Sequence, residues 1–143
     1  MRLLLIRHAQ TVWNAAGRVQ GQADPPLSEL GHPQCGALSE RVAPCRFDAI
    51  HASDLERARL TAEAVRQSAG GSIALVTHIR VIRLVLSLAA GLESMGLRWP
   101  WAIDNTGLST LVGPPDVSAW DTPAMRVLAV NDSTHLARLV HTR

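Results

Sequence analysis

The sequence predicts an α/β fold built on a mostly parallel sheet. Short apolar runs at residues 2–7 and 73–77 have the length and composition of buried parallel strands. A segment with helical apolar periodicity precedes or follows each strand, and glycine or proline residues separate the elements. This alternation of strand and helix is typical of α/β proteins.

Each element has a local signal. The strands are apolar runs, expected over residues 2–7, 47–52, 73–77, 108–112 and 126–130. The helices are expected from Ser28 to about Val42, from Ser53 to the Gly70–Gly71 pair, and from about Val81 to Ala90. Ser53 and Glu56 fit a capping box. Polar, irregular connections are expected over 8–27 and 93–106.

The composition describes one globular domain. The 143 residues fit a single domain over 1–143, and 47% of them are apolar. The net charge of +2 gives no reason to expect a nucleic-acid partner, and no apolar run is long enough to span a membrane. Arg7 and His8 interrupt the first apolar run, so we expect no signal peptide and a cytoplasmic protein. Cys35 and Cys45 lack metal-ligand spacing and are expected to be reduced thiols.

Three predicted strands end in side chains that can bind anions or carry protons. The first strand ends at Arg7 and His8, the second leads to Arg57 in the following helical turn, and the third ends at Thr77 and His78. Ligands of open α/β sheets bind beyond the carboxyl ends of the strands. Arginines bind phosphate oxygens through paired donors, and a histidine can attack phosphorus. The sequence therefore predicts a phosphate pocket with a histidine nucleophile.

Several spaced segments resemble the histidine phosphatases, the phosphoglycerate mutase-like superfamily. "RHAQTVWN" resembles the Arg-His signature, "SDLERARLTAEAV" the second-helix motif, and "ALVTHIRVIR" the strand and helix with the second histidine. "DPPLSELGHPQ" and "WDTPAMRVLAVNDSTHL" resemble further segments, and the latter resembles the tail of the broad-specificity phosphatase branch. The resemblance implies a three-layer α/β/α sandwich with one antiparallel strand in the sheet.

The resemblance also implies roles for five residues. His8 would be the nucleophile that becomes phosphohistidine, and Arg7 and Arg57 would clamp the phosphoryl oxygens. His78 would donate to the same oxygens in the transition state, and Asn14 would contact the phosphoryl group from the loop. No metal or cofactor is expected, because the arginines supply the positive charge. The expected partner is a small phosphorylated substrate, and a homodimer is left open.

Other residues near these motifs have structural interpretations that we prefer. Glu56 is expected to cap its helix and not to act as an acid. Arg83 matches a family position that we expect to be structural, although Arg80 and Arg83 could both face phosphate. Trp13 is expected to pack beneath the loop and not to bind substrate.

The chain departs from the family pattern at two places. Ile79 follows the second histidine, where the family usually has glycine. Only 20 residues separate Arg57 from His78, an interval in which family members have a strand and a long helical insertion that carries the general acid. A missing general acid typically lowers the rate by about 10²–10⁴-fold.

The short interval also affects the topology. In the family the sheet order is 3-2-4-1-5-6, so loss of strand 3 joins strand 2 to its neighbour, strand 4, through one helix. If that helix keeps its family face, the crossover is left-handed, whereas about 98% of such crossovers are right-handed. The helix could change face, chains could exchange segments, or residues could be missing between Gly70 and Gly71. We favour missing residues, because the motifs on both sides are intact.

Three functions remain in competition. The first is hydrolysis of small phosphomonoesters through phosphohistidine, which the tail "NDSTHL" favours. The second is phosphoglycerate mutase activity. The third is phosphate binding without catalysis, after loss of the general acid.

Overall fold

A five-stranded mixed sheet forms the centre of the computed structural model, which describes residues 1–65, 72–92, 100–114 and 125–140. The strands are β1 (Arg2–Arg7), β2 (Ala49–Ala52), β3 (Ser72–Thr77), β4 (Leu108–Val112) and β5 (Arg126–Asp132). Their order is β2-β3-β1-β4-β5. Only β4 runs against the others, because its pairings with β1 and β5 are antiparallel and the remaining pairings are parallel. The predicted sheet is therefore confirmed.

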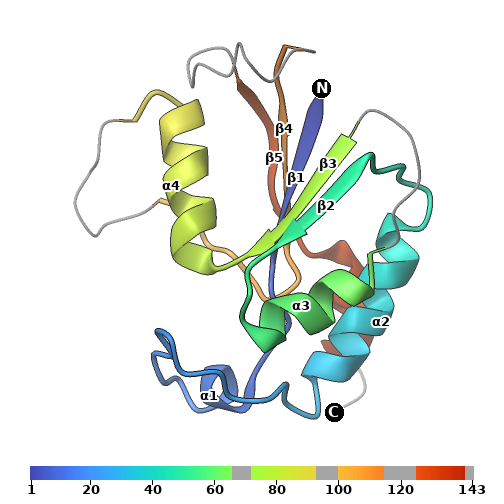
Figure 1. The fold of residues 1–143 in the computed structure, drawn as a ribbon, viewed down its shortest axis with the longest axis vertical. Helices are drawn as coiled ribbons and strands as arrows, with labels where there is room; N and C mark the ends of the chain where they lie inside the picture. Colours follow the sequence, from blue (N-terminus) through green and yellow to red (C-terminus); the bar gives the residue numbers. More distant parts are fainter. Residues whose placement is uncertain (66–71, 93–99, 115–124, 141–143) are drawn as a thin grey trace.

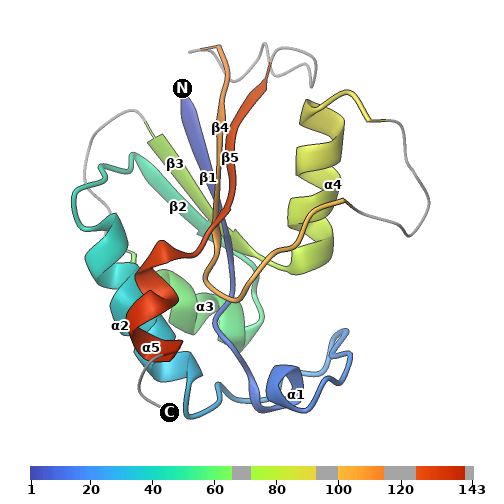
Figure 2. The same cartoon turned by 180° about the vertical axis from the view of Figure 1, so that it is seen from behind.

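Helices cover both faces of this sheet (Figures 1 and 2). On one face lie α2 (Gly31–Val42) and α3 (Glu56–Glu63), with the 3₁₀ turn η3 (Thr134–Leu136) and α5 (Ala137–Val140) beside α2. On the other face lies α4 (Ile79–Ala89). The resulting arrangement is the predicted three-layer α/β/α sandwich.

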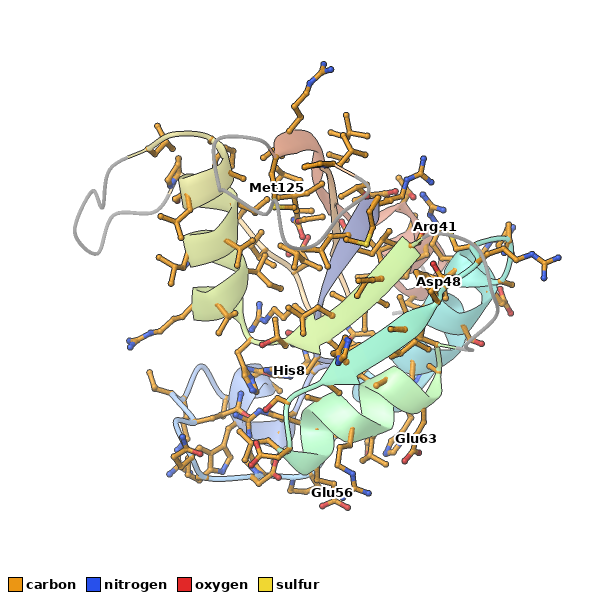
Figure 3. All side chains as sticks on the ribbon, turned by 45° about the horizontal axis from the view of Figure 1, so that its top comes forward. His8, Arg41, Asp48, Glu56, Glu63 and Met125 are labelled. Carbon is orange, nitrogen blue, oxygen red and sulfur yellow. The ribbon has the colours of Figure 1, made fainter. Side chains whose placement is uncertain are left out.

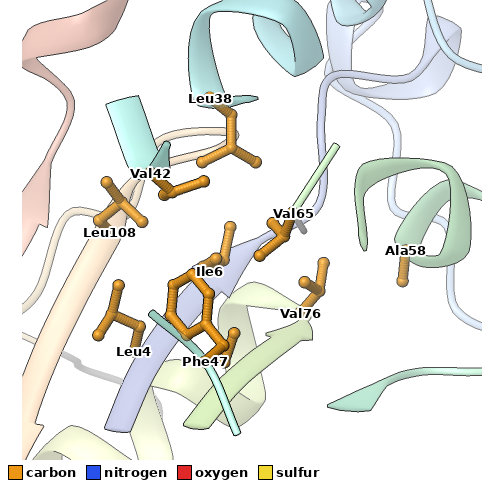
Figure 4. Close-up of a cluster of buried hydrophobic side chains, with 10 residues drawn as sticks. Leu4, Ile6, Leu38, Val42, Phe47, Ala58, Val65, Val76 and Leu108 are labelled. Carbon is orange, nitrogen blue, oxygen red and sulfur yellow. The ribbon is translucent and has the colours of Figure 1, made fainter. Parts of the chain in front are cut away.

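Alternation along the strands divides the core between the two faces. Leu4 and Ile6 of β1 pack with Phe47 and with side chains of α2 and α3 (Figure 4). Leu3 and Leu5 of the same strand pack against α4 on the other face. Because successive side chains of a strand point to opposite faces, the run Leu3–Ile6 supplies both cores and β1 is central.

The helices begin at different residues from those predicted. The predicted loop over 8–27 contains a short helix, α1 (Val12–Ala15), capped by the Thr11 side chain and closed by a reciprocal bond from Asn14. The helix predicted from Ser28 begins at Gly31, although the Ser28 hydroxyl does accept from the Gly31 N–H at 3.1 Å. The predicted capping box of Ser53 and Glu56 is wrong, since α3 begins at Glu56 and has no side-chain cap from its own N-cap residue.

The helix α3 lies on the same face of the sheet as α2. Ala58 of α3 and Leu38 of α2 belong to the same core cluster as Ile6. The crossover β1–α2–β2 runs outward to the edge strand, and β2–α3–β3 returns on the same face, so the two crossovers have opposite hands. Figure 1 shows that the first is right-handed, and the second is therefore left-handed. The option that the helix changes face is not what the structure shows, while the Gly70–Gly71 junction lies outside the described residues.

Two further findings bear on the composition. Cys35 and Cys45 are both free thiols. Within the ranges described, no helix has both the length and the apolar character required to cross a membrane.

Candidate functional site

A pocket of about 500 Å³ lies at the carboxyl ends of the parallel strands β1 and β3. All five residues singled out from the sequence line it: Arg7, His8, Asn14, Arg57 and His78. Figure 3 shows His8 between the end of the sheet and the segment that contains α1. The structure thus brings together residues that are up to 71 positions apart in the sequence.

The backbone around His8 is held from three elements. The His8 N–H donates to the Thr77 carbonyl of β3 at 3.0 Å, and the Asn105 amide donates to the His8 carbonyl at 2.8 Å. The next N–H, of Ala9, donates to the Thr61 hydroxyl of α3 at 2.9 Å. His8 itself is only 3% exposed. Its position is therefore fixed by the sheet, a helix and a loop together.

The contacts of the His8 ring determine its protonation. Nδ1 lies 2.8 Å from the Ala9 carbonyl oxygen, which can only accept, so Nδ1 carries the proton. Burial, followed by the positive charge of Arg7 and the proximity of His78, lowers the pKa of His8 from 6.5 to about 3, against the opposing effect of the Ala9 bond. At neutral pH the ring is uncharged, and Nε2 has a free lone pair.

Arg57 is 3% exposed, and its side chain binds to the segment that precedes α2. Its terminal nitrogens donate to the carbonyls of Gly21 and Ala23 and form an ion pair of 3.1 Å with Asp24. The Asp24 carboxylate also accepts from the backbone N–H groups of Glu56 and Arg57 and so caps α3 from 32 residues away. Burial acts to raise the pKa of Asp24, but these hydrogen bonds outweigh it and the pKa is lowered.

Arg7 is held by the loop that precedes β4. Its NH1 donates to the Ile103 carbonyl at 2.6 Å, and its backbone pairs with Thr106 and Gly107. Thr106 has a φ of 56°, a left-handed conformation that is uncommon for a β-branched residue. At Gly107, an added Cβ would lie 2.2 Å from the Asn131 side-chain oxygen. The loop therefore holds Arg7 through a tight and partly strained backbone.

His78 and Asn14 complete the pocket. Nε2 of His78 lies 2.9 Å from the Ser53 hydroxyl, and its ring centroid lies 5.2 Å from that of His8. Burial, followed by the charge of Arg57, lowers the pKa of His78. The Asn14 oxygen accepts from the Thr11 N–H and from the Asn105 amide, which leaves the Asn14 NH₂ group to donate to a ligand.

The arginines retain donors for an anion. Three buried side-chain nitrogens in the described part of the chain have no hydrogen-bond partner, and two of them are Nε of Arg7 and Nε of Arg57. Buried N–H groups are almost always paired in folded proteins. Two guanidinium groups, each with a buried Nε that has no described partner, lie beside neutral histidines and fit the oxygens of a phosphoryl group.

Acidic and metal-binding groups are scarce at the site. Among the described residues that line the pocket, Asp54 is the one carboxylate, and it is exposed. No cluster of three or more His, Cys, Asp or Glu side chains suited to a metal occurs within the described ranges. Nothing described here corresponds to the glutamate that the family carries on its insertion.

Sequence reasoning missed two residues that hold the site: Asp24 and Asn105. Ser53 follows the second strand as predicted, but its hydroxyl contacts His78 and does not cap α3. Glu56 does not cap α3 as predicted, and the Asp24 carboxylate caps this helix by accepting from the Glu56 N–H. The structural interpretation of Arg83 agrees with the contact observed, since Arg83 Nε donates to the Trp101 carbonyl. The Trp13 ring lies against Arg18, and its interpretation stays a prediction. Contacts this distant in sequence leave no local pattern, and only the order of the motifs could have suggested them.

The fold and the site define an α/β protein with a basic, histidine-containing pocket at the ends of its parallel strands. The family model of the histidine phosphatase superfamily (branch 1) matches residues 3–72. The chain belongs to the histidine phosphatase superfamily.

Curated relatives cover the chain in part or in full. The probable phosphoglycerate mutase GpmB of Erwinia tasmaniensis is 36% identical over 95 residues, which are 66% of this chain and 44% of that protein. The protein of the same name from Yersinia pestis is 30% identical over 147 residues, which cover 99% of this chain and 60% of the relative. The chain thus spans about half the length of the curated relatives that it matches.

Solved structures share the fold at low sequence identity. A phosphoserine phosphatase from Entamoeba histolytica has a TM-score of 0.78 and 18% identity, over 94% of this chain and 98% of that one. A putative alpha-ribazole-5'-P phosphatase from Escherichia coli has a TM-score of 0.77 and 19% identity, over 92% and 96% of the two chains. At these identities the likeness establishes the three-layer fold alone.

Proposed function

We propose that this protein is a phosphatase that hydrolyses small phosphomonoesters through a phosphohistidine at His8. The observation that carries the proposal is the state of the His8 ring, which is neutral, has Nδ1 bound to a carbonyl, and lines the same pocket as Arg7 and Arg57. The free lone pair on Nε2 is the group that a nucleophile at phosphorus needs.

The reaction proceeds in two steps. In the first, the Nε2 lone pair forms a bond to phosphorus while the ester P–O bond breaks, and the leaving oxygen takes up a proton from solvent water. In the second, water attacks phosphorus and gives up a proton to the solvent, the N–P bond breaks with its electron pair returning to Nε2, and inorganic phosphate leaves with His8 neutral again. Arg7 and Arg57 stabilise the charge on the transferring group in both steps, with His78 and the Asn14 amide as further donors.

The proposal is tested by trapping the phosphoenzyme. The protein is mixed with p-nitrophenyl phosphate and quenched in alkali, where phosphohistidine survives, and the modified residue is located by mass spectrometry. Phosphate on His8 is expected, and His8→Ala should give neither phosphoenzyme nor release of phosphate. His51→Ala is the matched control, because His51 is an exposed residue of β2 outside the pocket. Undiminished turnover in His8→Ala would contradict the proposal.

A mutase reaction is the second candidate, favoured by the name that the curated relatives carry. A mutase returns the phosphoryl group to a second position of the substrate instead of passing it to water. Incubation with 3-phosphoglycerate separates the two: free phosphate indicates the phosphatase, and 2-phosphoglycerate without free phosphate indicates the mutase.

Phosphate binding without turnover is the third candidate. It is favoured by the scarcity of acids that could protonate a leaving group, since Asp54, which is exposed, is the one carboxylate among the described residues of the pocket. Stabilisation of the protein by phosphate against heat, together with no phosphoenzyme from any ester, would support it.

A further inference from the structure

One buried histidine nitrogen has no hydrogen-bond partner among the described residues and does not belong to the phosphate pocket. Two of the three unpartnered buried nitrogens are on Arg7 and Arg57, and the third is Nδ1 of His135. His135 lies in η3, after β5, and does not line the pocket. Its side chain makes one hydrogen bond to the described part of the chain, between Nε2 and the Thr106 hydroxyl at 3.1 Å. This contact is therefore the polar anchor of the ring.

Thr106 depends on that contact. It is fully buried and has a φ of 56°, a left-handed conformation that a β-branched residue adopts only where its surroundings hold it. The bond to His135 is the one hydrogen bond that its side chain makes to a described residue. Loss of this bond would let the backbone at Thr106 relax.

The backbone of Thr106 and its neighbours sets the position of Arg7. The Thr106 N–H donates to the Arg7 carbonyl at 2.9 Å, and the Arg7 N–H donates to the Gly107 carbonyl at 3.3 Å. The Arg7 guanidinium donates from NH1 to the Ile103 carbonyl at 2.6 Å, while its buried Nε has no described partner. A shift of the loop 103–107 would therefore turn the guanidinium away from a bound anion.

A second contact joins the same loop to the end of β5. The Asn131 side-chain oxygen accepts from the Asp104 N–H at 2.7 Å, and its amide donates to the Asp104 carboxylate at 2.9 Å. Asn131 and His135 both belong to the segment 131–135, none of which lines the pocket. This segment thus holds the loop at two points from outside the site.

The His135 ring does not need a charge to make its contact. Burial lowers the pKa of His135 against the opposing effect of Asp132, and the charge of Arg41 acts in the same direction as burial. The ring is neutral at neutral pH. A glutamine amide, which is also neutral, can place a polar atom near the position of Nε2.

We propose that His135 is a positioning residue for phosphate binding, because its contact with Thr106 holds the loop 103–107 that keeps the Arg7 guanidinium directed at the phosphoryl oxygens. The inference rests on the proposed function for the role of Arg7. It goes beyond that function by giving the segment 131–135 a part in the affinity of the site.

The test measures binding of inorganic phosphate by titration calorimetry, at a temperature where circular dichroism shows each protein to be folded. His135→Leu should bind phosphate about tenfold more weakly, since it misplaces a charged hydrogen-bond donor of the site. His135→Gln should bind close to the unsubstituted protein, a rescue that a purely packing role of the ring would not give. His51→Leu is the matched control, because His51 is exposed on β2 and does not line the pocket.

A double-mutant cycle then tests the route through Thr106. Thr106→Val keeps the branched shape and removes the hydroxyl, so it should weaken binding as much as His135→Leu, and the double variant should bind no more weakly than either. If His135→Leu does not fold, Thr106→Val alone must show the tenfold loss.

Four results would overturn the inference: unchanged affinity in the folded single variants, a His135→Gln protein as weak as His135→Leu, additive losses in the double variant, or no phosphate binding by the unsubstituted protein. Failure of the proposed function is recognised separately, as phosphate binding without phosphohistidine in the unsubstituted protein.

Discussion

The His8 ring is buried, and it stays neutral in the folded protein over most of the pH range. The ring is shielded from water and faces two arginines and a second histidine, so the protonated form is strongly disfavoured in the folded protein. In the unfolded chain the same ring takes up a proton at ordinary pH values near 6.5. The residue that serves as the proposed nucleophile therefore also links folding to pH.

The direction of this link is determined by proton binding. Between about pH 3 and 6.5 the unfolded chain binds a proton at His8 that the folded protein does not, so the free energy of unfolding falls as the pH falls through this window. From pH 7 to pH 5 the loss attributable to His8 is about 2 kcal/mol. Urea denaturation at both pH values should show this loss in the unsubstituted protein and a correspondingly smaller loss in His8→Gln. Equal losses in the two proteins would contradict the depressed pKa.

Asp24 joins three features of the site: the ion pair with Arg57, the start of α3, and the loop before α2. We expect Asp24→Ala to lower the free energy of unfolding by about 1–3 kcal/mol, because it removes a helix cap and leaves Arg57 without its carboxylate. Asp24→Asn keeps an acceptor oxygen and should lose less. Denaturant titration measures both, with Glu40→Ala on the exposed side of α2 as the control. Equal stability of the alanine variant and the control would contradict this role.

At the scale of elements, two glycines of α2 provide a matched pair. At Gly31 an added Cβ would lie 2.2 Å from the Gln10 carbonyl oxygen, whereas at Gly36 nothing lies within 4 Å. Gly36→Ala should raise the free energy of unfolding by about 0.5–1 kcal/mol, because alanine loses less backbone entropy in a helix. Gly31→Ala should lower it, because the first turn of α2 must move away from Gln10. Thermal unfolding of both variants measures the difference, and a stabilised Gly31→Ala protein would refute the close approach.

The sequence predicted the strands better than the starts of the helices. The run Leu3–Ile6 and the polar pair after it identify a buried strand and its functional end from local residues alone. The start of α3 could not be read in this way, because its capping carboxylate belongs to Asp24, beyond an intervening helix and strand. Asn105 likewise reaches His8 from a loop 97 residues away and has no local signature. The site residues at the ends of strands could be predicted from local sequence. The loop residues that bind them could not, because their contacts are distant in the sequence.

At the scale of the whole molecule, the short interval between Arg57 and His78 should be visible in the kinetics of the 143-residue chain. If no group protonates the leaving oxygen, esters of acidic alcohols react and esters of ordinary alcohols react slowly. We expect kcat for p-nitrophenyl phosphate to exceed that for ethyl phosphate by about 10²–10⁴-fold. Steady-state release of phosphate from both esters measures the ratio. Similar kcat values would mean that a proton donor is present, and Asp54→Asn then tests the one described carboxylate of the pocket.

The left-handed crossover has a related consequence. We propose that the natural chain carries further residues between Gly70 and Gly71, since such a segment would remove the direct return from β2 to β3. The intact mass of the protein from its natural source tests the proposal, and a mass of 15.4 kDa would refute it. If the mass is larger, peptide sequencing should find the additional residues between Gly70 and Gly71.

The order of strands in the sheet also matters while the chain is being made. Each strand pair in the described sheet includes β3 or β4, so none can form before residue 72 exists. Ribosomes add about 5–20 residues per second, which leaves the apolar strand β1 without a strand partner for roughly 4–14 seconds. We expect the newly made Leu3–Ile6 segment to be unpaired during that time, which is the state in which apolar strands are prone to aggregate.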